Sequence, residues 1–210
     1  MLIFCLISRF VSQTLASLPT TLDADAAVQA AQEAFYKGDY PRALSALTPA
    51  LERHPKDPGV LNLKGAILTK EKDYTQARIC YEAALKEAPD FFPAIYNIGS
   101  LLALEGQLES ATTYFRNLLI EQPNNELLQY KLLLLLLRRN AEPDLQRKLF
   151  PSETPSNTPG WYFASAARSY KNGNYAEAAK YLDVAKSVYG DKVEIFQEEL
   201  DESGLREMKK

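Results

Sequence analysis

The sequence is poor in the residues that most often carry catalysis and metal binding. It has one histidine, His54, and two cysteines, Cys5 and Cys80, among its 210 residues. Ser-His-Asp, Cys-His and most zinc sites would all depend on that single histidine, and two distant cysteines form neither a disulfide framework nor a metal-binding pair. We therefore expect no enzyme active site, no metal and no cofactor. His54 beside Pro55 is better interpreted as a basic group that favours the end of a helix.

An excess of positive charge is also missing. The chain has 24 basic and 27 acidic residues, which gives a formal net charge of -3, and both signs are scattered. Without a basic stripe to neutralise phosphates, a nucleic acid is not an expected partner. The hydrophobic fraction of 46% is typical of a folded protein, and the length suits one domain with its own core.

No apolar run is long enough to cross a membrane. Residues 1–17 begin with a short apolar stretch and contain Thr14-Leu15-Ala16, which resembles a cleavage site, so they are expected to be a signal peptide or an N-terminal helix. The missing basic start and Arg9 within the apolar stretch oppose the signal peptide. We favour export, to the periplasm or cell envelope, over the cytoplasm, and expect no integral membrane span. The leucines at 132–137 are likewise too few to span a bilayer.

Proline and alanine recur at a fixed interval. Pro55, Pro89 and Pro123 are each separated by 34 residues. Other small residues repeat the interval in phase, which coincidence does not explain, so the chain is built from internal repeats. The positions in phase are Ala43, Ala77 and Ala111, then Ala50 and Ala84, then Gly65 and Gly99.

The third unit carries the clearest motif, from Ala94-Ile95-Tyr96-Asn97-Ile98-Gly99 through Gly106-Gln107-Leu108-Glu109-Ser110-Ala111 to Pro123. It resembles the tetratricopeptide-repeat family, whose unit of this length folds as two antiparallel helices. The resemblance implies an all-α fold, a right-handed superhelix (an α–α solenoid) of helix-turn-helix repeats with a C-terminal capping helix. The expected units are repeats at 24–57, 58–91 and 92–125, a degenerate repeat with a loop at 126–158, a further repeat at 159–192, the capping helix at 193–203 and a tail at 204–210.

Small residues and glycines have physical reasons within such a unit. Alanine or glycine at one position of each helix lets the two helices approach closely, as at Gly65 and Ala77. A glycine suits the end of each first helix, where a positive φ is needed, and Lys72 replaces it in the second unit. The remaining small residues are Ala31, Gly99 and Ala166 on first helices and Ala43, Ala111 and Ala178 on second helices, and the turn glycines are Gly38, Gly106 and Gly173.

Two helices near the C-terminus carry unusual patterns. In the degenerate unit, a first helix at about 126–139 includes the leucines at 132–137, which predicts burial on all sides. A short second helix is expected around 144–150, followed by a loop at 151–159. In the capping helix, an apolar stripe of three residues is expected to pack on the solenoid while the acidic side chains face away. The stripe is Val193, Phe196 and Leu200, and the acids are Glu194, Glu198, Glu199 and Asp201.

The resemblance implies a binding groove on the face that the first helices share. Carried onto this sequence, the family's groove positions include aromatic residues in several units, which suit an extended or helical apolar segment. The alternative is that these rings only pack between neighbouring first helices. Val28 and Gln32 stand where some family members have a lysine and an asparagine that grip a C-terminal carboxylate, which disfavours that mode. The groove candidates are Phe35, Tyr36, Asn62, Lys70, Tyr96, Tyr130, Phe163 and Tyr170.

The sequence therefore predicts a non-catalytic scaffold or adaptor that binds a peptide or protein segment. An alternative is a holdase-type chaperone for an apolar segment of a secreted protein, similar to the small tetratricopeptide chaperones of bacterial secretion systems. Those chaperones are cytoplasmic, so a cleaved signal would argue against that reading. An accessory domain of an enzyme is a third, less favoured alternative because the chain lacks catalytic constellations.

Overall fold

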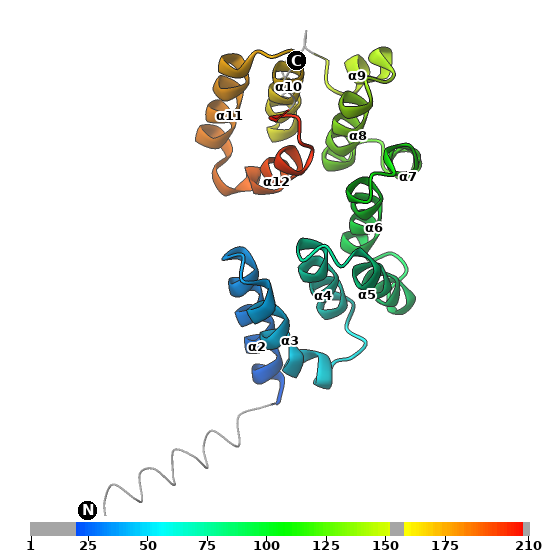
Figure 1. The fold of residues 1–210 in the computed structure, drawn as a ribbon, viewed down its shortest axis with the longest axis vertical. Coiled ribbons are helices and arrows are strands. Elements are labelled where there is room, and N and C mark those ends of the chain that lie inside the picture. The colour runs from blue at the N-terminus through cyan, green and yellow to red at the C-terminus, as the bar shows by residue number, and fades with distance from the viewer. Residues whose placement is uncertain (1–19, 152–157, 208–210) are drawn as a thin grey trace, which may run out of the picture. The chain divides into compact units, whose positions relative to one another are not determined.

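The structure, a computed structural model, describes residues 20–151 and 158–207, with side chains from Ala24 onward. The segment at 1–17, most of the expected loop at 151–159 and the last three residues of the tail lie outside this part of the chain. The described residues contain helices and no strand, which confirms the all-α prediction (Figure 1). The elements are α2 (Thr20–Tyr36), α3 (Tyr40–Arg53), α4 (Pro58–Lys70), α5 (Tyr74–Glu87), α6 (Phe92–Leu104), α7 (Leu108–Glu121), α8 (Glu126–Arg139), α9 (Pro143–Leu149), α10 (Pro159–Lys171), α11 (Tyr175–Tyr189), the 3-10 helix η1 (Gly190–Val193) and α12 (Glu194–Glu202).

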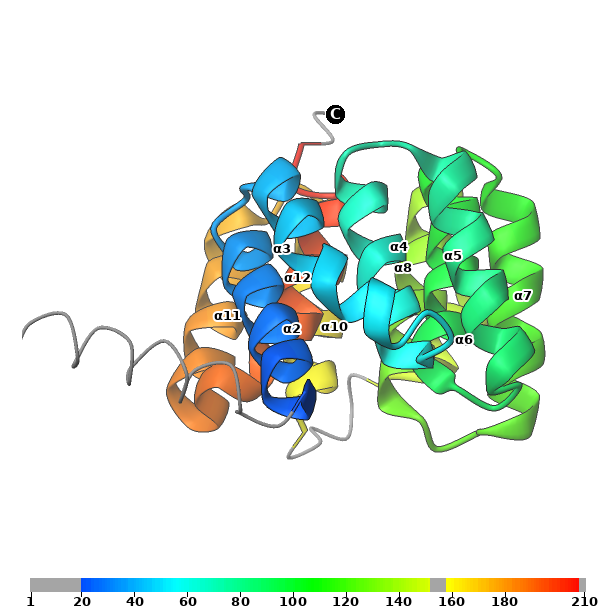
Figure 2. The same cartoon turned by 90° about the horizontal axis from the view of Figure 1, so that it is seen from below.

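The helices form two compact units, where the sequence was expected to form one domain. The N-terminal unit ends at Leu101 and the C-terminal unit begins at Leu102. In the N-terminal unit α2 packs against α3 and α4 against α5, and in the C-terminal unit α10 packs against α11. Figure 2 shows α2 beside α3 and α4 beside α5. In the C-terminal unit α8 contacts α7, α9 and α10, and α12 packs against both α8 and α10.

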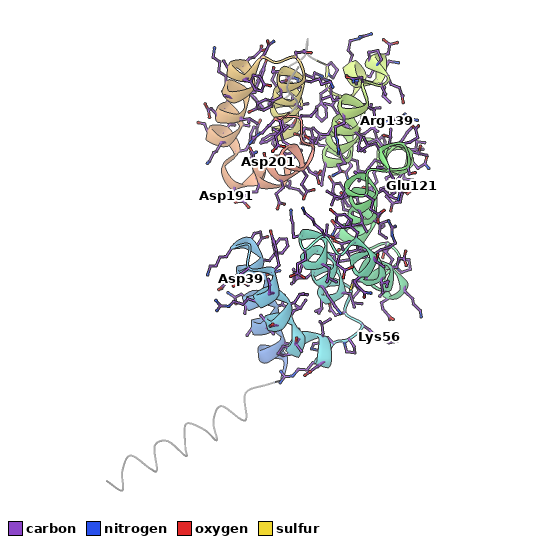
Figure 3. All side chains as sticks on the ribbon, in the orientation of Figure 1. Asp39, Lys56, Glu121, Arg139, Asp191 and Asp201 are labelled. Carbon is purple, nitrogen blue, oxygen red and sulfur yellow. The ribbon has the colours of Figure 1, made fainter. Side chains whose placement is uncertain are left out.

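Polar side chains begin several of these helices. Asp39, Asp57 and Asp73 each accept a hydrogen bond from a backbone N–H three residues on, at 3.2, 2.9 and 3.1 Å. Asn125 does the same for α8, through the N–H of Leu128 at 3.2 Å. These bonds satisfy N–H groups that have no partner within the helix. Figure 3 labels Asp39 in the turn between α2 and α3.

Small residues lie where the helices of each pair meet, as expected. The alanines at the predicted second-helix positions, Ala43, Ala77, Ala111 and Ala178, are buried completely. At Gly65 a Cβ atom would lie 2.5 Å from the ring of Tyr81 on α5. That ring is itself buried, and its hydroxyl shares a 2.9 Å hydrogen bond with Thr69. The glycine therefore makes the room into which the tyrosine ring packs.

The turn after each first helix needs a residue with a left-handed backbone conformation, that is, a positive φ. Gly38, Gly106 and Gly173 have φ values of 75°, 81° and 80°. Lys72 takes the same place with a φ of 65°, and its backbone N–H donates to Thr69 at 3.0 Å. The turn geometry therefore holds in the second repeat without the glycine, at the steric cost that a Cβ atom brings in this region.

The leucines at 132–137 are all buried, which confirms the prediction for this stretch of α8. Several of them join a core cluster with Trp161, Phe163 and Phe196. Because α8 has neighbours on several sides, a helix without a polar face is stable here. The second helix of this unit, α9, is only seven residues long, as short as the sequence indicated.

Replacing Gly65 by alanine should destabilise the N-terminal unit by about 1–3 kcal/mol, because the new methyl group collides with the Tyr81 ring. Thermal unfolding followed by far-ultraviolet circular dichroism measures this. Combining Gly65→Ala with Tyr81→Leu should cost less than the sum of the two single changes, since the smaller side chain relieves the collision. Strict additivity of the two changes would contradict the contact.

Replacing Lys72 by glycine should raise the free energy of unfolding by about 1 kcal/mol, because glycine removes the steric cost of the positive φ. The exposed Lys72 side chain contributes no core contact that would be lost. The matched control is Gly106→Ala, where no atom lies within 4 Å of the added Cβ and only the φ of 81° matters. We expect the two substitutions to shift the melting temperature in opposite directions; a shift of the same sign would refute the assignment.

Candidate functional site

An open pocket lies in the N-terminal unit between the first helices α2 and α4. Its volume is about 580 Å³, and Ala50 and His54, at the C-terminal end of α3, also line it. Both apolar and polar side chains line it, so it can contact hydrophobic groups and hydrogen-bonding groups. The lining residues are Ala24, Asp25, Val28, Gln29, Gln32, Ala50, His54, Asp57, Gly59, Val60 and Leu63.

Several of the expected groove residues of the N-terminal unit lie elsewhere on the same helices. Tyr36 is 80% exposed at the end of α2, and the half-buried Phe35 ring is 5.7 Å from it. Asn62 on α4 accepts a 2.9 Å hydrogen bond from Asn97 on α6, which links two first helices. Lys70, at the end of α4, is half-buried. None of these four expected residues lines the pocket, whereas Val28 and Gln32 do.

Tyr96, at the position equivalent to Asn62 one repeat on, is buried with 6% of its surface exposed. Its ring centroid lies 6.0 Å from that of Phe92 on the same helix. A side chain with so little accessible surface contributes to packing, so Tyr96 does not line an accessible groove. The alternative reading, in which this ring packs in the interior, fits its burial.

The equivalent rings of the C-terminal unit are covered by the chain itself. Tyr130 on α8 and Phe163 on α10 are 0% and 1% exposed, with ring centroids 6.1 Å apart. The ring of Phe196 on α12 contacts both rings, with centroid distances of 5.4 Å to Tyr130 and 5.8 Å to Phe163. The expectation that Tyr130 and Phe163 line an accessible groove is therefore corrected: they do lie on the face of the first helices, but α12 occupies it.

The segment after α12 extends this cover along α10. The guanidinium of Arg206 lies 5.5 Å from the ring centroid of Tyr170, the last of the expected groove residues. Tyr170 is half-buried and also contacts Tyr175 at 5.8 Å between ring centroids. In Figure 1, α12 lies beside α10 and α8, in agreement with its contacts. We name this covered surface, formed by Tyr130, Lys131, Phe163 and Tyr170, the α8–α10 face.

A buried ion pair fixes α12 on this face. The ammonium of Lys131 on α8 contacts the carboxylate of Glu199, and both side chains are buried. The ammonium also lies 5.9 Å from the ring centroid of Phe115. The sequence-based expectation that Glu199 faces away from the core is wrong. Because α12 packs against two helices, its buried surface includes Glu199 as well as the apolar stripe of Val193, Phe196 and Leu200.

Two buried groups have shifted pKa values. Burial, aided by the carboxylate of Glu199, raises the pKa of the Tyr130 phenol well above its ordinary value. Burial likewise raises the pKa of the Cys80 thiol, which favours the protonated and less reactive form. Within residues 20–151 and 158–207, no group of three His, Cys, Asp or Glu side chains is arranged to hold a metal ion.

Comparison with known proteins now decides the family. The family model described as "Tetratricopeptide repeat" matches residues 28–91 and 72–126. The chain belongs to the tetratricopeptide-repeat family. A tetratricopeptide repeat protein from Parabacteroides merdae has 20% identity and a TM-score of 0.54, over 89% of this chain and 74% of its own. PilF from Pseudomonas aeruginosa has 19% identity and a TM-score of 0.56, over 89% and 91% of the two chains. These two likenesses show the shared helical-repeat fold.

One curated relative is much longer. Protein O-mannosyl-transferase TMTC1 of Mus musculus is 34% identical over 95 residues, which is 43% of this chain and 10% of the mouse protein. The chain thus spans about a tenth of that relative. Tetratricopeptide repeats are typically non-catalytic and suit protein interaction, although this relative is named a transferase. In the part of the chain that the structure describes, no helix combines the length and apolarity needed to cross a membrane.

Removing the carboxylate of Glu199 should strongly destabilise the C-terminal unit. Glu199→Ala breaks a buried ion pair by removing the carboxylate that contacts the Lys131 ammonium, which costs about 3–5 kcal/mol. Denaturant unfolding can follow this through Trp161, the only tryptophan of the sequence, which lies in the core of that unit. The control, Glu194→Ala on the exposed side of α12, should cost less than about 1 kcal/mol. Equal effects from the two changes would show that the ion pair does not hold α12.

Proposed function

We propose that this protein is a non-catalytic scaffold that binds a peptide or protein segment on the first-helix face of its N-terminal unit. The supporting observation is the open pocket between α2 and α4, about 580 Å³ in volume. Val28 and Leu63 supply apolar walls, and Gln29 and Gln32 supply exposed amide groups at its edge. Pockets that combine an apolar surface with a few polar groups suit a specific segment.

The lining chemistry favours a mixed segment over a purely apolar one. His54 and Asp57 lie beside Val60 in the same pocket, so polar groups interrupt the apolar wall. A holdase for an apolar stretch would need a continuous apolar surface, which this pocket does not offer. We infer a ligand that places one apolar side chain between α2 and α4 and hydrogen-bonds through its backbone to the glutamines.

The close packing of the helix pairs makes such binding compatible with a rigid receptor. The helix pairs around the pocket are packed through Ala31, Ala43 and Leu47, all of which are fully buried. A receptor whose walls are already ordered loses little conformational entropy on binding. The ligand would therefore contact helix surfaces that exist before it arrives.

Substitution at the pocket edge tests this proposal. Peptides selected from a random display library against the full-length chain should bind Gln29→Arg/Gln32→Arg at least about 10-fold more weakly, because long charged side chains fill and polarise the pocket. Isothermal titration calorimetry with the selected peptides measures the affinity. The control is Ile79→Arg, an exposed position on the second helix α5, which should leave binding unchanged. Loss of binding only in the control would place the site on the second helices.

A further inference from the structure

The helix α12 occupies a surface that the repeat architecture ordinarily presents. It packs against α8 and α10, both first helices, and Phe196 lies on Tyr130 and Phe163. These two rings occupy the place in their repeats that Val28 occupies in the first repeat, where Val28 lines the open pocket. The same position of the repeat is thus accessible at Val28 and covered by α12 at Tyr130 and Phe163.

We propose that α12 is a displaceable ligand of the α8–α10 face, and that this face accepts an amphipathic helix of the same pattern from another protein. The pattern is an aromatic residue, a carboxylate three residues later and a leucine directly after it, as in Phe196, Glu199 and Leu200. The aromatic ring contacts Tyr130 and Phe163, and the carboxylate pairs with Lys131. This second site is independent of the pocket between α2 and α4.

The construction of α12 suits release. The helix has nine residues, and a helix of this length is marginal without packing. Gly190, at the start of η1 before α12, and Gly204, two residues after α12, have φ values of 57° and 68°. These glycines mark backbone turns at both ends, where a change of direction is sterically cheap. α12 can therefore unfold or swing away while α8, α10 and α11 keep their own contacts.

The fit of α12 also leaves room for a better ligand. With α12 on the α8–α10 face, which we call the closed form, the Tyr130 hydroxyl and the Arg206 Nε–H are buried without a hydrogen-bond partner. Buried polar groups left unsatisfied weaken the closed form relative to one in which they are paired. A partner helix that brings an acceptor to Tyr130 would gain a hydrogen bond that α12 does not make.

Covalent linkage gives α12 an advantage that a partner must overcome. A tethered segment acts at an effective concentration in the millimolar range, so a free helix of equal intrinsic affinity is largely excluded. Weakening α12 within the chain, without changing the face, should therefore open the site. Phe196→Ala does this because Phe196 belongs to α12 and the receptor residues stay intact.

The test uses a fluorescently labelled peptide of residues 190–207 and the full-length chain. The peptide should bind the Phe196→Ala chain at least about 10-fold more tightly than the unaltered chain, as measured by fluorescence anisotropy. The matched control is Ile195→Ala, at a neighbouring position of α12 that is 45% exposed, which should bind no more tightly than the unaltered chain. A peptide carrying Phe196→Ala should bind neither.

Charge exchange tests the role of Lys131. In the Phe196→Ala background, Lys131→Glu should reverse the preference of the face, so that a peptide with Glu199→Lys binds more tightly than the original peptide. A folded Phe196→Ala chain, with the Trp161 emission of the unaltered protein, that binds no peptide would overturn the proposal. So would an unaltered chain that is a dimer and becomes a monomer on Phe196→Ala, since α12 would then be exchanged between copies.

Hydrogen exchange of the unaltered chain decides the matter even if Phe196→Ala unfolds the unit. A displaceable α12 should open without global unfolding, so its amide groups should exchange at least about 10-fold faster than those of the leucine stretch of α8. Equal protection of the two helices would overturn the proposal. None of these measurements involves a ligand of the N-terminal unit, so their outcome is independent of binding between α2 and α4.

Discussion

The close approach of the two helices in each repeat is the constraint on which the rest of the structure depends. At Gly65 the absence of a side chain admits the Tyr81 ring, and Ala77 beside it is fully buried. Because the helices of a pair bury these faces against each other, other faces of the first helices are left to form surfaces. A larger side chain at either small position would move the first helix and every side chain that it presents. Function in this fold therefore begins with residues that never contact a ligand.

The first-helix face is used in different ways by equivalent positions. Val28 lines an open pocket, Asn62 forms a hydrogen bond with Asn97, and Tyr130 is covered by Phe196. All three positions lie on first helices, so their roles differ through the side chain and through the segments that reach them. A small aliphatic residue leaves space, an amide pairs with its neighbour, and a large ring recruits an apolar cover. Residue chemistry and the path of the chain together determine which of these positions remain accessible.

The sequence predicted the elements of the fold far better than the state of the site. Proline spacing, turn glycines and in-phase alanines indicated the helices, and the leucines at 132–137 indicated burial, because these signals are local and periodic. The pairing of Lys131 with Glu199 joins residues 68 positions apart, and no periodicity encodes it. An acidic run such as 198–202 is usually a solvated face, so Glu199 gave no sign of burial. Likewise, the predicted groove positions lie on first helices, but whether another segment covers them depends on the path of the chain after α11.

The buried ion pair distinguishes α12 from a cap that only protects a core. Lys131 lies next to the leucine stretch of α8, and apolar residues at both positions would commonly be as stable or more stable than a buried pair. A charged pair instead favours one register, because a shift of α12 would move the Glu199 carboxylate away from the Lys131 ammonium. It also makes the packing of α12 depend on a specific carboxylate, that of Glu199. Phe196 provides apolar contact, and the pairing of Glu199 with Lys131 discriminates against a helix that lacks a carboxylate there. The α8–α10 face therefore has the two properties that a selective binding surface requires.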